Sequence, residues 1–179
     1  MQSVVKLLSA LLTRQVAVVA LLLCTSCSHY QLGSGADGKL SFRTLYVAPV
    51  ENKTHVPQAR ELLSTQMREA LAHDPRVTLV NSPEAADATL SVTLKDYHRD
   101  VATVREGDTG LARKFNLTLG AIATLHDNRT AKDLFTSRPV SAVRESFTDS
   151  GQLQSEYQTL PLLADALAAK ITHAALDVW

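Results

Sequence analysis

Two cysteines three positions apart, Cys24 and Cys27, are the residues whose type and spacing most directly predict a chemical reaction. They follow an apolar run, Val16–Leu23, which is itself preceded by a segment with the basic residues Lys6 and Arg14 and no acidic residue. Such a run is too short to cross a bilayer, which takes about 20 residues. The pattern is typical of a signal peptide. The predicted reaction is therefore acylation of a thiol at the point where the signal is removed.

The residues before Cys27 decide which thiol is modified. Thr25 and Ser26 are small, as in the sequences cleaved by the lipoprotein signal peptidase, so cleavage after residue 26 would make Cys27 the first residue of the mature chain. Residues 1–26 are thus predicted to be the signal. Cys27 is predicted to carry a covalent diacylglycerol on its sulfur and an N-acyl chain on its amino group.

Three other interpretations of the cysteine pair remain open. Lipidation of Cys24 would place the bulky Leu23 directly before the cut. Cys24 and Cys27 could instead form a disulfide, or a C-x-x-C metal site. A zinc site needs four ligands, and the chain contains no third cysteine. The acylated Cys27 therefore remains the favoured interpretation, with no metal site predicted.

Acid–base chemistry has one candidate, the alternating trio Asp96, His98 and Asp100. A carboxylate beside an imidazole can act as a general acid–base pair. On a strand, however, these three residues share the face opposite Tyr97 and Arg99, and a solvated polar stretch explains them equally well. The six histidines are scattered singly, and no G-x-S-x-G or P-loop motif is present. We therefore predict no catalytic residue and no enzymatic activity.

Basic residues gather near the expected end of a long β-hairpin. Arg105, Arg113 and Lys114 could contact phosphate groups, because guanidinium and ammonium groups pair with phosphates. The acidic residues Glu106 and Asp108 lie among them, so a mixed, solvated hairpin tip is the alternative.

The composition of the mature chain limits the possible partners. Residues 27–179 retain 16 Lys and Arg against 18 Asp and Glu, which gives a formal charge of minus two and no indication of nucleic-acid binding. Acyl chains on Cys27 would hold the protein on a membrane, at about 0.8 kcal/mol per buried methylene. Ser28 follows the acylated position, in place of the Asp that often retains lipoproteins in the inner membrane. We therefore expect an anchor on the periplasmic face of the outer membrane.

The first half of the mature chain predicts a tether and then mixed elements. Residues 27–40 are rich in glycine and have little to pack, whereas residues 41–179 are long enough for one domain with a core. A strand is expected over Phe42–Ala48, and Pro57 suits the first turn of a helix that ends near His73. A short strand is expected around Val77.

The second half predicts a sheet followed by a helix. Apolar residues alternate from Ala88 to Leu94 and again from Phe115 to Leu125, with a hairpin loop between them. A less regular strand, interrupted at Pro139, suits a sheet edge. A final helix is expected from Leu160, capped by Thr159. We therefore predict an α+β fold with two helices packed on one face of a mostly antiparallel four- to five-stranded sheet.

Several stretches in this order resemble the LptE-type lipopolysaccharide-assembly lipoproteins, and the resemblance covers nearly all of residues 27–179. They are SHYQLGS after the lipid cysteine, LYVAPVENKTHVPQARELLSTQMREAL, DPRVTLVNSPEAADATLSVTLKDYHRD and the closing LPLLADALAAKITHAALDVW. The order Ser-His-Tyr-Gln-Leu-Gly departs from the commoner Gly-Tyr-His-Leu of that family. No short motif aligns well enough to transfer particular lipopolysaccharide-contacting residues.

The resemblance implies a non-catalytic protein without a cofactor. Members of that family plug the lumen of the large outer-membrane β-barrel LptD, help it to assemble and contact lipopolysaccharide. The order of strands and helix is also similar to periplasmic lipoproteins related to CsgG and to activators of peptidoglycan synthases. The alternative function is therefore a docking module that binds a cell-wall synthase or its own copies.

Overall fold

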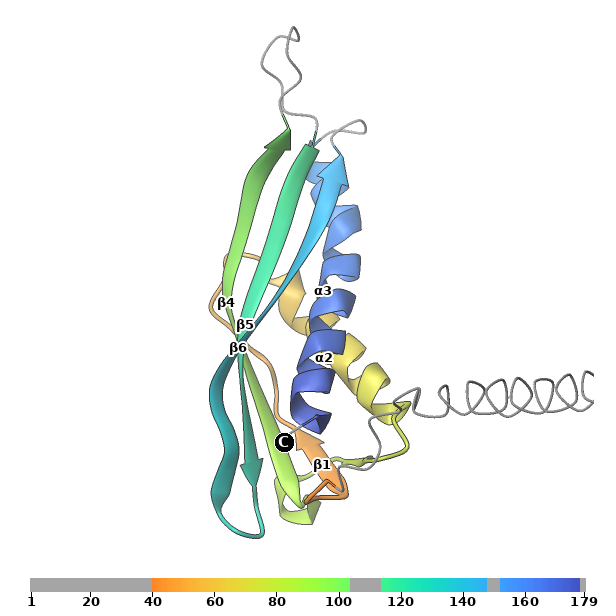
Figure 1. Cartoon of the computed structure of the whole chain (residues 1–179). Helices are drawn as coiled ribbons and strands as arrows, with labels where there is room; N and C mark the ends of the chain where they lie inside the picture. The colour runs from red at the N-terminus through yellow and green to blue at the C-terminus, as the bar shows by residue number, and fades with distance from the viewer. Residues whose placement is uncertain (1–39, 104–113, 148–151, 178–179) are drawn as a thin grey trace, which may run out of the picture. The chain divides into compact units, whose positions relative to one another are not determined.

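A computed structural model of the chain describes residues 40–103, 114–147 and 152–177 (Figure 1). The chain divides into two units at Asp37 and Gly38, and every described residue lies in the second. The predicted signal peptide, Cys24, Cys27 and almost all of the predicted tether lie outside the described residues. These assignments, and the domain boundaries that follow from them, stay predictions.

The described domain has the predicted α+β class, with two long helices and one mixed sheet. In chain order its elements are β1 (Thr44–Val47), β2 (Glu51–Asn52), α2 (Gln58–Ala72), β3 (Thr78–Val80), the short 3-10 helix η2 (Pro83–Ala85), β4 (Ala88–Thr103), β5 (Lys114–Asp127), β6 (Lys132–Phe147) and α3 (Gln152–Leu176). The strand order is β3-β1-β4-β5-β6, and β2 pairs with β4 off this path.

The three long strands are antiparallel, as the alternating pattern predicts, and the short strands are parallel. β4 pairs with β5 and β5 with β6 in antiparallel ladders. β1 pairs in parallel with both β3 and β4, and β2 pairs in parallel with β4. The helix α2 connects β1 to β3. It brings the chain back to the end of the sheet where β1 begins, and parallel neighbouring strands need such a crossover connection.

Both helices lie on one face of the sheet, which confirms the prediction (Figure 1). On β5 the odd-numbered residues from Leu117 to Leu125 are buried under the helices, and the even-numbered residues face the other way. Leucine dominates the core, which has these large side chains fully buried: Phe42, Leu45, Leu63, Met67, Leu71, Leu90, Leu94, Leu117, Leu119, Leu125, Leu163 and Leu167. The face without helices is called the open face below.

A β-bulge at Lys95 changes which residues of β4 face the helices. The pairing with β5 shifts between Leu94 and Asp96, because Leu94 lies opposite Ala121 and Asp96 opposite Gly120. Leu94 is fully buried, and Tyr97, three positions later, again packs against the core. An extra residue of this kind reverses the alternation of the strand. Asp96 therefore lies on the open face, although strict alternation from Leu94 would bury it.

The helix α3 begins at Gln152, so the prediction that Thr159 caps it was wrong. Thr159 lies inside the helix and is buried, and its hydroxyl donates to the carbonyl of Ser155, one turn earlier, at 2.7 Å. Pro161 lies in the interior of this helix. Packing of the first turns of α3 on β6, where Thr159 meets Ser146 at 3.3 Å, accompanies this earlier start.

Candidate functional site

Of the three predicted hairpin-tip cations, Lys114 is the one that the structure describes. Arg105 and Arg113 are outside the described residues, whereas Lys114 is the first residue of β5. Its ammonium group pairs with Glu145 at 2.7 Å and lies 5.7 Å from the centre of the Phe147 ring. Lys114 is thus held at the end of the sheet by two residues of β6.

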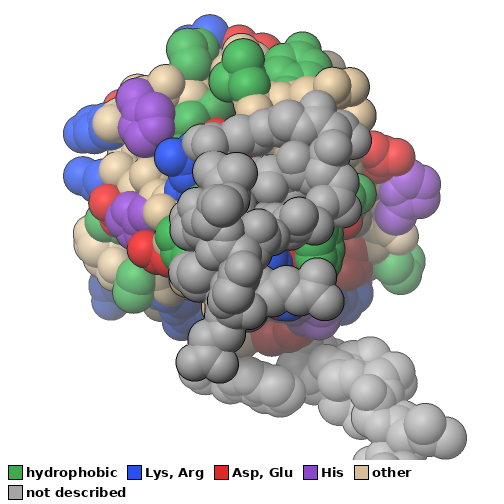
Figure 2. Space-filling model, turned by 90° about the horizontal axis from the view of Figure 1, so that it is seen from above, with side chains coloured by type: hydrophobic (Ala, Val, Ile, Leu, Met, Phe, Trp, Pro, Cys, Tyr) green, Lys and Arg blue, Asp and Glu red, His purple; other side chains and the backbone are tan. Residues whose placement is uncertain are grey.

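Positive and negative charges are interspersed at this end of the domain. Figure 2, seen from above, shows Lys and Arg, Asp and Glu, and His side chains interspersed around the visible rim of the molecule. At the described end of the strands, Lys114 and Glu145 are of opposite charge. A phosphate-binding role for Arg105, Arg113 and Lys114 stays a prediction.

Asp96, His98 and Asp100 share the open face of β4, as predicted, and all three are exposed. No hydrogen bond or ion pair joins them to one another among the described residues. No group of His, Cys, Asp and Glu in the described ranges is arranged to hold a metal ion. The trio is therefore solvated sheet surface in this structure, without the contacts between acid and base that a proton-transfer site uses.

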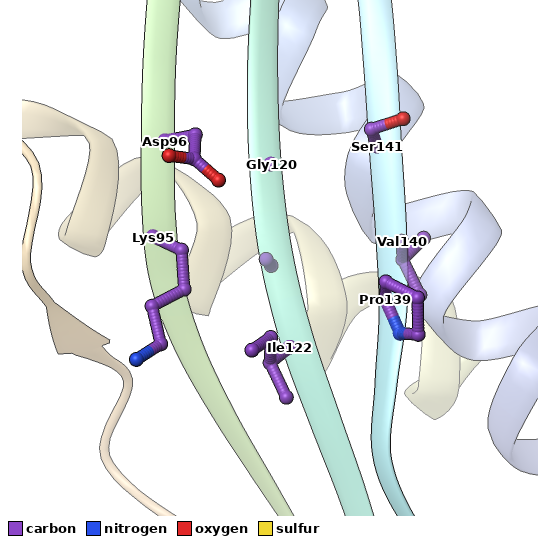
Figure 3. Close-up of a pocket in the computed structure, with 8 residues that line it drawn as sticks. Lys95, Asp96, Gly120, Ile122, Pro139, Val140 and Ser141 are labelled. Atoms are coloured by element: carbon purple, nitrogen blue, oxygen red, sulfur yellow. The ribbon is translucent and has the colours of Figure 1, made fainter.

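A shallow depression of about 650 Å³ lies on the open face in the middle of the three long strands (Figure 3). Lys95 and Asp96 of β4 border it on one side and Pro139 and Ser141 of β6 on the other, with Gly120 on β5 between them. The absence of a side chain at Gly120 makes this room, because a Cβ there would lie 3.4 Å from the Cβ of Asp96.

On β4 and β5, the remainder of the open face is rich in hydroxyl groups. Hydroxyl or amide side chains at alternating positions of β4 and β5 form it: Thr89, Ser91, Thr93, Asn116, Thr118 and Thr124. An antiparallel sheet can present such a face to water while its other face packs on the core. The open face is thus polar along β4 and β5.

On the helical face, a cluster of polar groups joins β4 to α3. The carboxylate of Glu156 accepts from the hydroxyl of Tyr97 at 3.4 Å and forms an ion pair with Arg99. The ring of His55 meets that of Tyr97 edge-on, with the ring centres 5.4 Å apart. Burial, and then the negative charge of Glu156, raises the pKa of Tyr97 to about 12. The phenol is therefore a neutral hydrogen-bond donor at physiological pH.

An apolar groove runs beside this cluster, between the starts of α2 and α3. It consists of two adjoining depressions of about 480 and 320 Å³, both lined by Gln58, Tyr157 and Leu160. Tyr157 is 70% exposed and Leu153, one turn earlier, is 85% exposed.

Neither the Tyr97–Glu156 cluster nor this groove was predicted from the sequence. The expected start of the last helix, at residue 160, left Glu156 and Tyr157 outside any element. The sequence indicated only that Tyr97 and Arg99 share the face of the strand opposite Asp96, His98 and Asp100.

No described helix is long and apolar enough to cross a membrane. None of the curated proteins compared with the chain matches it.

The arrangement of two helices on one face of a mixed sheet defines the class of protein, an α+β domain found in several bacterial proteins of solved structure. A hypothetical protein from Chlamydia trachomatis aligns with a TM-score of 0.54 at 10% identity, covering 74% of this chain and 94% of that one. An uncharacterised lipoprotein B from Nitrosomonas europaea aligns with a TM-score of 0.52 at 18% identity, covering 74% and 81%. A protein from Xanthomonas campestris aligns with a TM-score of 0.52 at 13% identity, covering 75% and 83%.

The family follows from the sequence match. The model of the lipopolysaccharide-assembly family, LptE, matches residues 42–174, which extend from β1 through most of α3. The chain belongs to this family. The resemblance noted in the sequence is confirmed, and the role it carries is that of a lipopolysaccharide-assembly lipoprotein.

Proposed function

We propose that this protein is the lipoprotein that plugs an LptD-type outer-membrane β-barrel, helps it to assemble, and takes part in transport of lipopolysaccharide to the cell surface. The observation that carries the proposal is the family match over residues 42–174, which includes every described strand, all of α2 and most of α3. The protein acts by binding and needs no cofactor. Its covalent anchor is the diacylglycerol and N-acyl chain on Cys27, which hold it on the periplasmic face of the outer membrane.

The length of the sheet supports a position within a barrel. The strands β4 and β6 each contain 16 residues. At about 3.3 Å per residue they extend about 50 Å, whereas the apolar band of an outer-membrane barrel is about 25 Å tall. A domain with this sheet along the barrel axis reaches through the lumen, with the hairpin tip far from the other end of the sheet.

The character of the open face supports the same position. Barrel interiors are polar, and the open face presents hydroxyl and amide groups at alternating positions of β4 and β5. Such groups hydrogen-bond to a polar wall or to the water between the two proteins. In this arrangement Arg105, Arg113 and Lys114 at the tip contact phosphate groups of lipopolysaccharide.

The test is isolation of the full, lipidated chain from mild detergent extracts of outer membranes. We expect an LptD-type barrel to be recovered with it in equal amount, and depletion of the chain to reduce both folded barrel and lipopolysaccharide at the cell surface. Recovery of a ring of its own copies, or of a peptidoglycan synthase without a barrel, would replace this proposal with the docking-module alternative.

A photoreactive amino acid at Thr118 refines the test, because this side chain lies in the middle of the open face of β5. The proposal expects a crosslink to the inner wall of the barrel. The same amino acid at the fully buried Leu119 is the matched control and should give no crosslink to the barrel.

A further inference from the structure

The strand β6 forms one edge of the sheet, and its backbone has a side without a neighbouring strand. In an antiparallel pair, successive residues turn their N–H and C=O groups alternately toward and away from the partner. Two observations identify the outward residues. Pro139 has no N–H and is tolerated in a ladder only where its nitrogen points outward. The carbonyl of Ser141 accepts a hydrogen bond at 2.7 Å from Lys170, which reaches it from α3.

The outward set therefore consists of the odd-numbered residues, and its first two members are already blocked. Pro139 offers no donor, and Lys170 occupies the carbonyl of Ser141. Val143, Glu145 and Phe147 follow with regular pairing to β5 on their other side. Within the described ranges, the main-chain groups of these three residues have no hydrogen-bond partner beyond the β5 ladder. This stretch, Ala142–Phe147, is called the free edge.

Apolar side chains flank the free edge on both faces of the sheet. Val143 is 52% exposed and Phe147 is 55% exposed, and both lie on the open face. On the helical face, Leu162 of α3 is 60% exposed and lies next to the edge, because its carbonyl accepts from Nε of Arg144 at 3.5 Å. An added strand would cover exposed apolar surface above and below itself.

The edge that β4 forms beyond its pairing with β2 is protected in the usual way. Beyond the contact of β2 with Leu94, the strand β4 carries the charged residues Asp96, Arg99 and Asp100. Charged side chains at an edge oppose addition of another strand. The free edge of β6 carries two charges: Arg144, whose side chain contacts the carbonyl of Leu162 on α3, and Glu145, which pairs with Lys114. Of these two, only Glu145 belongs to the outward residues.

We propose that the free edge of β6 binds an extended segment of a partner protein as an additional strand. Unpaired N–H and C=O groups in register select a polypeptide backbone, because no other ligand repeats both groups at this spacing. The side chains opposite Val143, Glu145 and Phe147 would be apolar, basic and apolar at every second position. The carboxylate of Glu145 has acceptor capacity for such a base beside its existing pair with Lys114.

A second copy of this chain fits the free edge poorly. An antiparallel pair of identical strands is symmetric about its centre, and the one register that pairs all three outward residues, Val143, Glu145 and Phe147, is centred on Glu145. The two Glu145 carboxylates would then lie directly opposite each other, which is destabilising. A centre at Val143 would require Ser141 and Pro139 to take part, and both are blocked. The occupant is therefore a different protein. This inference does not depend on the identity of a barrel partner.

The test uses the full, lipidated protein in detergent micelles and the capped peptide TVTKTVT. Hydrogen exchange of individual backbone amides is followed by NMR. At a peptide concentration about nine times its Kd, the amides of Val143, Glu145 and Phe147 should exchange about tenfold more slowly, by the factor 1 + [L]/Kd. The peptide TVTETVT should bind more weakly, because it places a carboxylate against Glu145.

Two variants distinguish strand addition from non-specific binding of the peptide. Val143→Pro removes one outward N–H without removing a hydrogen bond to β5, and should abolish the protection. Val143→Thr keeps the backbone and should retain it. A TVTKTVT peptide methylated on the amide nitrogens that face the edge should not bind to the native chain, and this comparison holds even where Val143→Pro fails to fold.

Three results would overturn the proposal. The first is unchanged exchange at saturating peptide, and the second is equal binding of the methylated peptide. The third is a concentration-dependent dimer of the native chain that Val143→Pro abolishes, because the occupant would then be a second copy.

Discussion

The hydroxyl of Tyr97 on β4 donates to the carboxylate of Glu156 on α3, 59 residues later in the chain, with 3.4 Å between the two oxygens. Arg99, on the same face of β4, pairs with the other oxygen of that carboxylate. One acidic side chain thus fastens the start of α3 to the half of β4 that extends beyond the short strands. The anchoring of α3 at this end depends on a polar contact as well as on leucine packing.

Replacement of Tyr97 by Phe should lower the free energy of unfolding by about 0.5–1.5 kcal/mol, the usual contribution of one hydrogen bond. The effect should also depend on pH. The pKa of Tyr97 is raised to about 12 in the folded protein, against about 10 in an unfolded chain. The neutral phenol therefore contributes its full stability below pH 10, and this contribution is lost as the pH rises through 12. Urea unfolding over this interval should show a steeper decline for the native chain than for Tyr97→Phe.

The matched control for this measurement is Tyr157→Phe. Tyr157 is 70% exposed on α3, so loss of its hydroxyl should leave the free energy of unfolding nearly unchanged. If the free energy of unfolding fell equally steeply with pH in Tyr97→Phe and in the native chain, the pKa of Tyr97 would not be raised by folding.

A second prediction concerns Arg76, which joins two segments 101 residues apart. Its guanidinium binds Asp74 at 2.8 Å and Asp177, just beyond α3, at 3.0 Å. Arg76→Gln should lower the free energy of unfolding by about 1–2 kcal/mol at neutral pH, between the values for exposed ion pairs and for hydrogen bonds to charged groups. Urea unfolding measures the difference.

The same variant should flatten the acid limb of the stability curve. The side-chain hydrogen bond from Arg76 lowers the pKa of Asp74, and hydrogen bonds from His173 and then Arg76 lower that of Asp177. The stability from lowered carboxyl pKa values is present above about pH 4 and is lost as the pH falls through the folded values. Arg60→Gln is the comparison for an exposed pair: Arg60 lowers the pKa of Glu61 in the same way, but both side chains are exposed, so its effect on the acid limb should be smaller. An acid limb unchanged in Arg76→Gln would contradict the assignment.

The elements that the sequence predicted well are those whose pattern is purely local. The alternation of Leu117, Leu119, Ala121, Ala123 and Leu125 predicts β5 and its buried face, and the structure confirms both. The amphipathic stripe after Pro57 likewise predicts α2, which begins at the next residue.

The features that sequence analysis missed depend on contacts between distant segments. The bulge at Lys95 arises from the register between β4 and β5, which the composition of β4 does not reveal. The early start of α3 contradicts the local preference that places Pro161 in a first turn, and contacts such as that of Thr159 with Ser146 accompany it. The Tyr97–Glu156 pair requires both of these features. For the hairpin tip, the sequence still provides the only information on Arg105 and Arg113.

A third prediction concerns Gly120, which has no left-handed backbone angle and faces Asp96 across the depression. A Cβ there would meet the Cβ of Asp96 at 3.4 Å, an ordinary contact distance. Gly120→Ala should therefore stabilise the protein by about 0.5 kcal/mol, because it reduces the freedom of the unfolded chain. Thermal unfolding measures the change. A marked destabilisation would show instead that the bulge beside Asp96 needs the space.

A fourth prediction tests lipopolysaccharide contact at the tip. If Lys114 contacts phosphate, its pair with Glu145 at 2.7 Å competes with that contact. Glu145→Gln should then strengthen binding of purified lipopolysaccharide about two- to fivefold, the range set by an exposed ion pair. The double variant Arg105→Gln with Arg113→Gln should weaken binding and reduce its dependence on salt. Weaker binding by Glu145→Gln would exclude Lys114 from the contact.

The lipid anchor gives the last prediction. Cys27→Ala should remove the thiol that receives the diacylglycerol, so the chain should keep its signal and incorporate no labelled fatty acid. Cys24→Ala is the matched control and should be labelled and processed like the native chain, because Thr25 and Ser26 still precede the acceptor. Metabolic labelling and the shift in mass distinguish the two. Labelling that persists in Cys27→Ala and vanishes in Cys24→Ala would assign the anchor to the other cysteine and move the start of the mature chain by three residues.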